Sequence, residues 1–433
     1  MKKTANILLA VFLTVPAFAT LKASDFERDL NNIPNKQAVS EENPNLPAPT
    51  AAPAVSAPSP VSRWWSVTFF GSAHKAITKA ALAFTNKNEY PDIGRAKDYL
   101  IDGGNDESGH ANSSANGGLT KDMWYGKTPI SKGGVLYNYE QFDSTSAYER
   151  LGALCHLTQD QAVPTHAANI KHGISDSFEG WPSWDNKVDV ASSRGNYTDM
   201  EPYEYYQAVQ DDTRKHLGQW VDPATGRPYW VPADNAPPLG QDSTFGPWGH
   251  YGGVRNSDVW AVPDHSNDNN EGGNNSNKWV TATPEIRFRQ LAVAGAATVA
   301  VFESASKKLP PLVKDLSVSP QTVRSGEMGV IKFTALDNRS KEVSYKLNVY
   351  RDGVLLGEAF QGMMTLNDPA SGEIMLSAST RATWLSEVNG QPAAPGNYVL
   401  ELVLTDSDGN TTPDEVNYDG NPANDTKVKV TVN

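Results

Sequence analysis

The sequence predicts two domains of different fold class: a mainly α-helical domain, a helical bundle with a long loop-rich insert, followed by an all-β antiparallel sandwich. Two changes of pattern along the 433 residues mark the boundaries. Residues 20–63 are rich in proline and alanine and show no periodicity, and after Pro310 apolar residues recur at every second position instead of with helical spacing. We therefore place the helical domain at residues 64–309 and the sandwich at residues 310–433.

Residues 1–19 have the organisation of a secretory signal peptide. Two lysines precede an apolar run, and the triplet Ala17-Phe18-Ala19 supplies small residues for a cleavage site. We therefore expect a secreted protein that is exported through the inner membrane. Residues 20–63 would then be a linker or a pro-segment, and the sequence leaves open whether they are cleaved.

The charge balance argues against a protein that binds nucleic acid mainly through its phosphates. Acidic residues outnumber basic ones by 50 to 37, which gives a formal net charge of −13. To bind a partner mainly through that partner's phosphates, the protein would need an excess of positive charge, so we expect no stable nucleic-acid partner. Metal ions can nevertheless supply that charge for a phosphate-containing substrate.

The single cysteine, Cys155, lies in an apolar stretch and is interpreted as a buried hydrophobic residue. We expect the chain to act as a monomer.

Apolar residues at a spacing of three to four predict the helices of the first domain. The longest such pattern has a capping-box pair, Ser146 and Glu149, at its start and Pro164 at its end. Thr283 and Pro284 have the pattern of a cap followed by proline at the first position of another helix. The expected helices cover residues 73–85, 93–100, 146–163 and 285–307, whereas residues 102–140 and 181–282 are expected to be irregular.

The second domain shows the alternation that is typical of half-buried strands. Apolar residues alternate in residues 345–349, 398–404 and 428–432, and Asp352-Gly353 provides a turn after the first of these segments. Short strands of this kind predict the antiparallel sandwich. The run 406–410, Asp-Ser-Asp-Gly-Asn, resembles the start of a calcium loop, so calcium is a candidate ligand of this domain, although such runs are also ordinary hairpin turns.

Histidines in the helical domain carry the strongest functional signal. His156 and Asp160 are four residues apart, so on a helix they project from one face, as two ligands of one ion must. His166 follows the break at Pro164 and can face a neighbouring ion. Imidazole and carboxylate without thiolate favour zinc. Five histidines form the candidate series: His74, His110, His156, His166 and His172.

A lone histidine on an apolar helix is more often a hydrogen-bonded core residue than a ligand. Five histidines with interspersed carboxylates in one domain nevertheless predict a site for several metal ions. The other three, His216, His250 and His265, lie in the loop-rich insert and are interpreted as surface residues.

The spacing His156-x3-Asp160-x5-His166-Ala-Ala-Asn resembles the bacterial zinc-dependent phospholipase C family of the clostridial alpha-toxin type. A glutamate shortly after it, a histidine-bearing helix upstream and a tryptophan before that helix belong to the same resemblance. It covers residues 64–309 and is most specific at residues 156–179. It implies a helical catalytic domain with three zinc ions, followed in some members by a β-sandwich that assists engagement of a membrane.

The resemblance also implies which residues bind each ion. The first ion would be bound by the amine and carbonyl of an N-terminal Trp64 with His74 and Asp160, the second by Asp106, His110, His156 and a bridging Asp160, and the third by His166, His172 and Glu179.

Two of these assignments leave alternatives open. Ser175 stands where the family usually has a histidine, so Asp176 is an alternative to Glu179 as the carboxylate beside His172. The candidates for the upstream carboxylate are Asp102, Asp106 and Glu107, of which we choose Asp106.

The implied activity is hydrolysis of phospholipids such as phosphatidylcholine to diacylglycerol and a phosphorylated head group. Zinc would activate the attacking water and stabilise the charge of the phosphodiester, and Asp106 is the candidate catalytic residue that orients or deprotonates that water. The membrane surface is a candidate partner through the C-terminal domain. The alternatives are a zinc-dependent single-strand nuclease of related fold, and a secreted adhesion or binding protein whose metals are structural.

Overall fold

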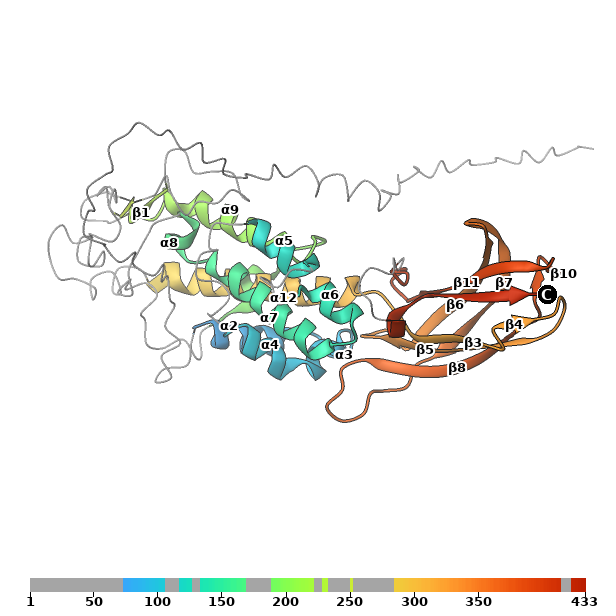
Figure 1. Ribbon diagram of the computed structural model, residues 1–433. Helices are drawn as coiled ribbons and strands as arrows, with labels where there is room; N and C mark the ends of the chain where they lie inside the picture. Colours follow the sequence, from blue (N-terminus) through green and yellow to red (C-terminus); the bar gives the residue numbers. More distant parts are fainter. Residues whose placement is uncertain are drawn as a thin grey trace, which may run out of the picture. The chain divides into compact units, whose positions relative to one another are not determined.

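The computed structural model describes an α-helical region that is followed along the chain by a β region (Figure 1). The described residues are 73–105, 117–126, 133–168, 188–221, 228–232, 250–251, 284–413 and 422–433. The expected signal peptide and residues 20–63 lie outside them, so both stay predictions. None of the helices in the described ranges is long and apolar enough to span a membrane.

The helical region contains short and long helices, and a two-stranded antiparallel ribbon, β1 (Trp230–Val231) with β2 (His250–Tyr251), is also described there. The helices are α2 (Ala73–Phe84), α3 (Pro91–Arg95), α4 (Lys97–Gly103), α5 (Gly117–Tyr125), α6 (Val135–Glu140), α7 (Ser144–Asp160), α8 (Pro164–Ala167), α9 (Tyr205–Leu217) and α12 (Pro284–Lys308), with the 3₁₀-helix η2 (Val190–Asn196).

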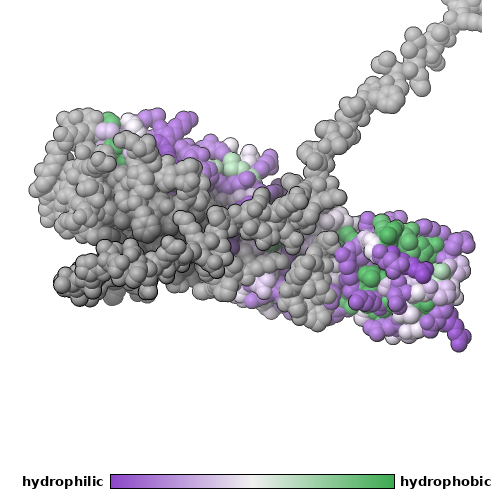
Figure 2. All heavy atoms as spheres, turned by 45° about the horizontal axis from the view of Figure 1, so that its top comes forward, coloured by the Kyte–Doolittle hydropathy of each residue, from purple (hydrophilic) through white to green (hydrophobic). Residues whose placement is uncertain are grey.

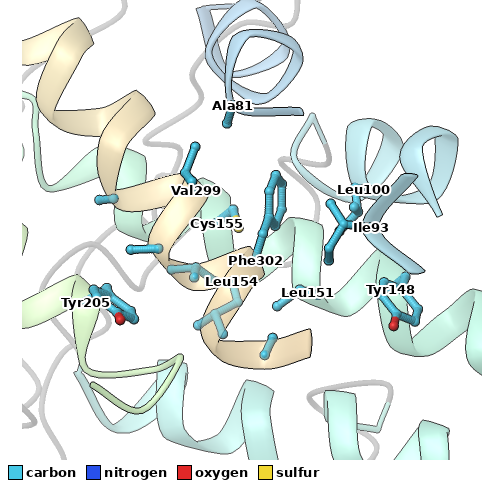
Figure 3. Close-up of a cluster of buried hydrophobic side chains, with 14 of the residues drawn as sticks. Ala81, Ile93, Leu100, Tyr148, Leu151, Leu154, Cys155, Tyr205, Val299 and Phe302 are labelled. Atoms are coloured by element: carbon cyan, nitrogen blue, oxygen red, sulfur yellow. The ribbon is translucent and has the colours of Figure 1, made fainter. Parts of the chain in front are cut away.

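Helices α7 and α12 supply the centre of the helical core. Leu151, Leu154 and Cys155 of α7 lie in one buried cluster with Phe302 of α12, as Figure 3 shows. Burial raises the pKa of the Cys155 thiol well above its usual value, which confirms its interpretation as a core residue. In α12, every residue of the segment 291–302 is buried, so this apolar stretch is a core helix.

The structure corrects two predictions of irregular chain. Residues 102–140 contain α5 and α6, and residues 181–282 contain η2 and α9. The buried face of α9 is formed by aromatic and polar residues such as Tyr205, Tyr206 and Gln210, so its sequence lacks a clear aliphatic stripe. Contacts with α7, α8 and α12 stabilise it instead, as tertiary packing does for most short helices.

The ends of α7 also differ from the prediction. The N-cap is Asp143, whose carboxylate accepts a hydrogen bond from the backbone N–H of Ser146 at 3.0 Å, so the predicted capping box at Ser146 and Glu149 is wrong. The helix ends at Asp160, and Pro164 begins α8 instead of ending α7. Proline is favoured there because the first turn of a helix leaves its N–H groups unpaired.

The β region contains two larger sheets, with strand orders β4-β12-β11-β6-β7 and β3-β5-β8. Neighbouring strands are antiparallel except for β12 and β4, which are parallel. The strands are β3 (Leu312–Ser319), β4 (Thr322–Val323), β5 (Gly329–Asp337), β6 (Glu342–Arg351), β7 (Val354–Thr365), β8 (Leu376–Trp384), β9 (Glu387–Val388), β10 (Gln391–Pro392), β11 (Gly396–Thr405) and β12 (Lys427–Val432), with a 3₁₀-turn η3 (Pro422–Asn424).

Buried residues from both sheets share one apolar core, to which Phe333 of β5 and Leu400 of β11 belong. The predicted turn at Asp352-Gly353 joins β6 to β7. Both residues have positive φ, 53° and 76°, as a tight hairpin turn requires.

Polar contacts join the helical region to the β region, and both belong to one compact unit. Asn338, which follows β5, donates from Nδ2 to Oδ2 of Asp92 at 3.0 Å and to the carbonyl oxygen of Ser306 at 2.9 Å. Arg95 donates to the carbonyl oxygen of Ile374 at 2.6 Å. Ile374 is itself part of the helical core, so a few residues after position 310 complete that core, while the two sheets have a core of their own.

Candidate metal centre

Two histidines and one aspartate meet inside the helical region: His74 of α2 with His156 and Asp160 of α7. Nε2 of His74 lies 3.4 Å from Oδ1 of Asp160, and Nε2 of His156 lies 3.8 Å from Oδ2. All three residues are buried, and their candidate ligand atoms lie within 4.8 Å of one another. In the part of the chain that the structure describes, this is the one group of three or more residues arranged to bind a metal ion.

Close packing of α4 against α7 positions the histidine of α7. His156 and Asp160 share a face of the helix because they are four residues apart. On the α4 side, the two backbones approach so closely that a Cβ added to Gly152 would lie 2.5 Å from the carbonyl oxygen of Leu100. The approach brings the carbonyl oxygen of Gly104 to 3.1 Å from Nδ1 of His156.

The hydrogen bonds of both imidazoles favour the metal-binding tautomer. Nδ1 of His156 contacts the carbonyl oxygen of Gly104, and Nδ1 of His74 lies 2.8 Å from Oε1 of Gln159. A carbonyl oxygen only accepts, so Nδ1 of each ring carries a hydrogen, and in a neutral ring Nε2 then keeps the lone pair. Proteins usually orient a metal-binding histidine in this way, with a hydrogen bond from the ring nitrogen that does not bind the metal.

The geometry fits a zinc ion. The two rings are stacked, with centroids 3.9 Å apart and planes inclined by 17°. Two protonated rings would repel each other at that distance, so the stack favours neutral imidazoles. Ligand atoms about 2.0–2.2 Å from a tetrahedral zinc ion lie about 3.3 Å from one another, close to the shorter of the two separations. Asp160 turns one oxygen to each histidine, so its carboxylate can bind one ion or bridge two.

Of the other predicted ligands, His166 alone lies within the described residues. It is buried on α8, and it is not a member of the His74–His156–Asp160 group. Asp102, one of the candidates for the upstream carboxylate, is exposed on α4. The remaining ligands and alternatives lie outside the described residues and stay predictions: Trp64, Asp106, Glu107, His110, His172, Asp176 and Glu179.

No protein-family model and no curated protein matches the chain. Solved structures that are similar to it include the alpha-toxin of Clostridium perfringens from the avian strain SWCP, at a TM-score of 0.26 and 10% identity, and the alpha toxin of Clostridium absonum, at 0.26 and 11%. Each comparison covers 84% of this chain and 98% of the other. The Pseudomonas fluorescens alkylpurine DNA glycosylase AlkC, bound to DNA with an abasic site analogue, has a TM-score of 0.18 at 10% identity, over 83% of this chain and 97% of its own. Similarities this weak do not establish a shared fold.

His216 is half-buried on α9 and not fully at the surface as predicted. Its Nδ1 lies 2.7 Å from the carbonyl oxygen of Asp212, and its ring stacks on Trp220. Arg289 of α12 forms an ion pair with Asp212 at 2.8 Å, so these residues join α9 to α12. The side chain of His250 and all of His265 lie outside the described residues.

The run 406–410 forms a turn that its own side chains close. Oδ1 of Asp406 accepts the backbone N–H groups of Asp408 and Asn410, each at 2.8 Å, and the Asn410 amide donates to Oδ2 at 2.7 Å. Asp408 forms an ion pair with Arg339. Both carboxylates are therefore engaged within the fold, and this turn gives the calcium prediction no support.

Residues around the ligands were missed by the sequence analysis. Gln159 contacts His74, and Thr298 of α12 contacts Gln159 in turn. Arg287, buried at 3% exposure, lines a pocket together with His74 and Gln159, and brings a positive charge beside the centre. Neither residue carried a clear signal in the sequence: Arg287 lies between Glu285 and Arg289 at the charged start of α12, and Gln159 offered only its position next to Asp160.

Proposed function

We propose that the chain is a secreted, zinc-dependent phosphodiesterase of the phospholipase C type, which hydrolyses phospholipids such as phosphatidylcholine to diacylglycerol and a phosphorylated head group. The observation that supports it most is the buried group of His74, His156 and Asp160, with Nε2 of each histidine close to the carboxylate. Imidazole and carboxylate donors without a thiolate suit zinc.

Each residue of the group has a distinct role in this proposal. His74 and His156 would each bind one ion through Nε2, and Asp160 would bridge the two ions because Oδ1 faces one histidine and Oδ2 the other. Zinc, when bound, lowers the pKa of a coordinated water to about 7 and supplies the positive charge that a phosphodiester substrate requires in an acidic protein. Asp106 would orient or deprotonate the attacking water.

The wider proposal keeps the domain plan that the sequence predicts. A signal peptide at residues 1–19 would direct export, residues 64–309 would form the catalytic domain with three zinc ions, and the two sheets of residues 310–433 would pack as a β-sandwich. The further ligands would be Trp64, Asp106, His110, His166, His172 and Glu179.

Exposed apolar side chains support a membrane as the site of action. Figure 2 shows apolar patches on the surface of the β region. Six of the nine large apolar side chains that are exposed in the described residues belong to it: Met328, Val330, Val354, Leu355, Met363 and Leu385. Such patches on a soluble protein often mark an interaction surface.

The test is zinc content combined with substrate choice. The secreted full-length protein should contain zinc, lose hydrolysis of a chromogenic choline phosphodiester after chelation, and recover it when zinc is restored. Release of head groups from defined phospholipid vesicles should depend on zinc in the same way. Hydrolysis of single-stranded DNA in place of the choline ester would show a nuclease, and bound zinc without either activity would show a binding protein with structural metals.

A further inference from the structure

The side chain of Gln159, on α7, forms hydrogen bonds with residues of α2 and α12 beside the metal centre. It lies on α7 next to Asp160 and is 1% exposed. Its Oε1 lies 2.8 Å from Nδ1 of His74 on α2. Its Nε2 donates to Oγ1 of Thr78, also on α2, at 3.1 Å and to Oγ1 of Thr298 on α12 at 3.0 Å.

The orientation of this amide follows from the hydroxyl of Thr298. A threonine hydroxyl has a single hydrogen, and that of Thr298 is donated to the carbonyl oxygen of Ala294 at 2.7 Å. The Thr298 oxygen can therefore only accept from Gln159, which requires the NH₂ group of the amide on that side. The carbonyl oxygen of Gln159 must then face His74 and can only accept, so Nδ1 of His74 must carry the hydrogen.

We infer that Gln159 is a positioning residue that fixes His74 in the tautomer with a lone pair on Nε2, and that Thr298 fixes Gln159. The inference rests on the proposed metal centre, since Nε2 is the atom of His74 that lies 3.4 Å from Asp160. Without Gln159 the ring could rotate or exchange its hydrogen to Nε2, and a hydrogen on that nitrogen would block metal binding. Outer hydrogen bonds of this kind typically change metal affinity about 10–100-fold.

Three variants of the full-length protein separate positioning from packing. Gln159→Leu should lower zinc affinity by about 10–100-fold, measured by competition with a chromogenic chelator. Gln159→Glu keeps an acceptor toward His74 but turns a second oxygen toward Thr298, which can only accept, so its zinc affinity should lie between those of Gln159→Leu and the parent. Thr298→Val preserves shape but removes one of the two hydroxyl groups that accept from the amide nitrogen, so a smaller loss is expected. The matched control is Gln210→Leu, which removes another buried glutamine, one that donates to Gln161 at 2.8 Å and is no part of the centre.

Nitrogen NMR of the histidine rings in metal-free protein gives a second readout, independent of activity. His74 should be protonated on Nδ1 in the parent and should become a mixture of tautomers in Thr298→Val, which remains informative if Gln159→Leu does not fold. Parent affinity in Gln159→Leu, or a neutral His74 of the parent with its hydrogen on Nε2, would overturn the inference. A parent chain that binds no zinc but keeps the Nδ1 tautomer would contradict the proposed function and leave the role of Gln159 standing.

Discussion

At the scale of single residues, Asp160 has the most demanding position, because its buried carboxylate is shared between two histidines. We expect Asp160→Asn to reduce phosphodiesterase activity by more than about 100-fold and to lower zinc content, since the amide offers one oxygen in place of two and no negative charge. Melting temperature should fall as well, because a bound ion would join α2 to α7 and stabilise the folded state. Activity, zinc content by mass spectrometry and thermal unfolding measure the three effects.

His156→Ala should give the same losses through removal of one imidazole. Asp98→Asn is the control, because Asp98 is exposed in the first turn of α4, is not a candidate ligand, and should leave zinc content and melting temperature nearly unchanged. An Asp160→Asn protein with full zinc and parental activity would show that the metal centre is assigned wrongly.

The spacing of His156 and Asp160 was sufficient to predict that they share a helix face. That His74 meets them depends on how α2 crosses α7, and the family resemblance, not the periodicity, supplied that expectation. The role of Gln159 depends on Thr298, which is 139 residues later in the chain. A contact of that sequence separation leaves no local pattern, so it could not be predicted from spacing.

At the scale of elements, the close contact of α4 with α7 sets the position of the Gly104 carbonyl beside His156. We expect Gly152→Ala to destabilise the protein by about 1–3 kcal/mol and to weaken zinc binding, because the new methyl group would lie 2.5 Å from the backbone oxygen of Leu100. Chemical denaturation and chelator competition measure both effects.

Gly94→Ala is the matched control for that substitution. Gly94 lies in helix α3, and the three atoms nearest to a Cβ there all belong to the flexible side chain of Lys87, the closest at 3.4 Å. Replacing a helical glycine by alanine should therefore be neutral or stabilising by up to about 1 kcal/mol. Equal effects of the two substitutions would contradict a tight contact at Gly152.

The elements that the sequence predicted well are those with a strong period, namely α2, α7, α12 and the strands β6, β11 and β12. Helices α5, α6 and α9 were missed because their buried faces include polar and aromatic residues such as Asn138, Tyr139 and Thr213. Strand β8 alternates buried or half-buried residues with exposed ones, but most of them are serine, threonine and alanine, which carry little hydrophobic contrast. Packing partners, not local preference, decide such segments.

At the scale of the whole molecule, the junction between the helical and β regions makes stability depend on pH. Burial is the largest of the causes that together raise the pKa of Asp337 to about 7; hydrogen bonds from the backbone N–H groups of Arg339 and Ser340 lower this pKa, and nearby Asp406 and Asp92 raise it. Tyr139 of α6 also faces this carboxylate. In the unfolded chain the pKa of Asp337 is about 3.9. Between about pH 4 and 7 the folded state therefore binds more protons than the unfolded state.

Stability contributed by protonated Asp337 should therefore be complete below about pH 4 and be lost as pH rises to about 7. The loss is at most about 4 kcal/mol, since each unit of pKa difference corresponds to about 1.4 kcal/mol. Asp337→Asn should flatten this dependence. Urea unfolding of both proteins at pH 4.5 and 7.5 measures the difference, and parallel slopes would show that another group, such as Asp406 or Glu303, controls the transition.

The exposed apolar residues of the β region should matter for bilayers and not for soluble substrates. Met328, Val354, Leu355 and Met363 are 54–69% exposed, so their replacement by serine should change folding stability little. The variant should retain full turnover of a soluble choline phosphodiester, because His74, His156 and Asp160 all lie in the helical region. Vesicle binding and head-group release from bilayers should fall at least about tenfold.

Phe84→Ser, which removes an exposed apolar side chain from α2, is the control and should leave both activities unchanged. Equal loss on both substrates would mean that the β region supports the metal centre through the Asn338 junction, whereas parental release from vesicles would remove the membrane role of this surface.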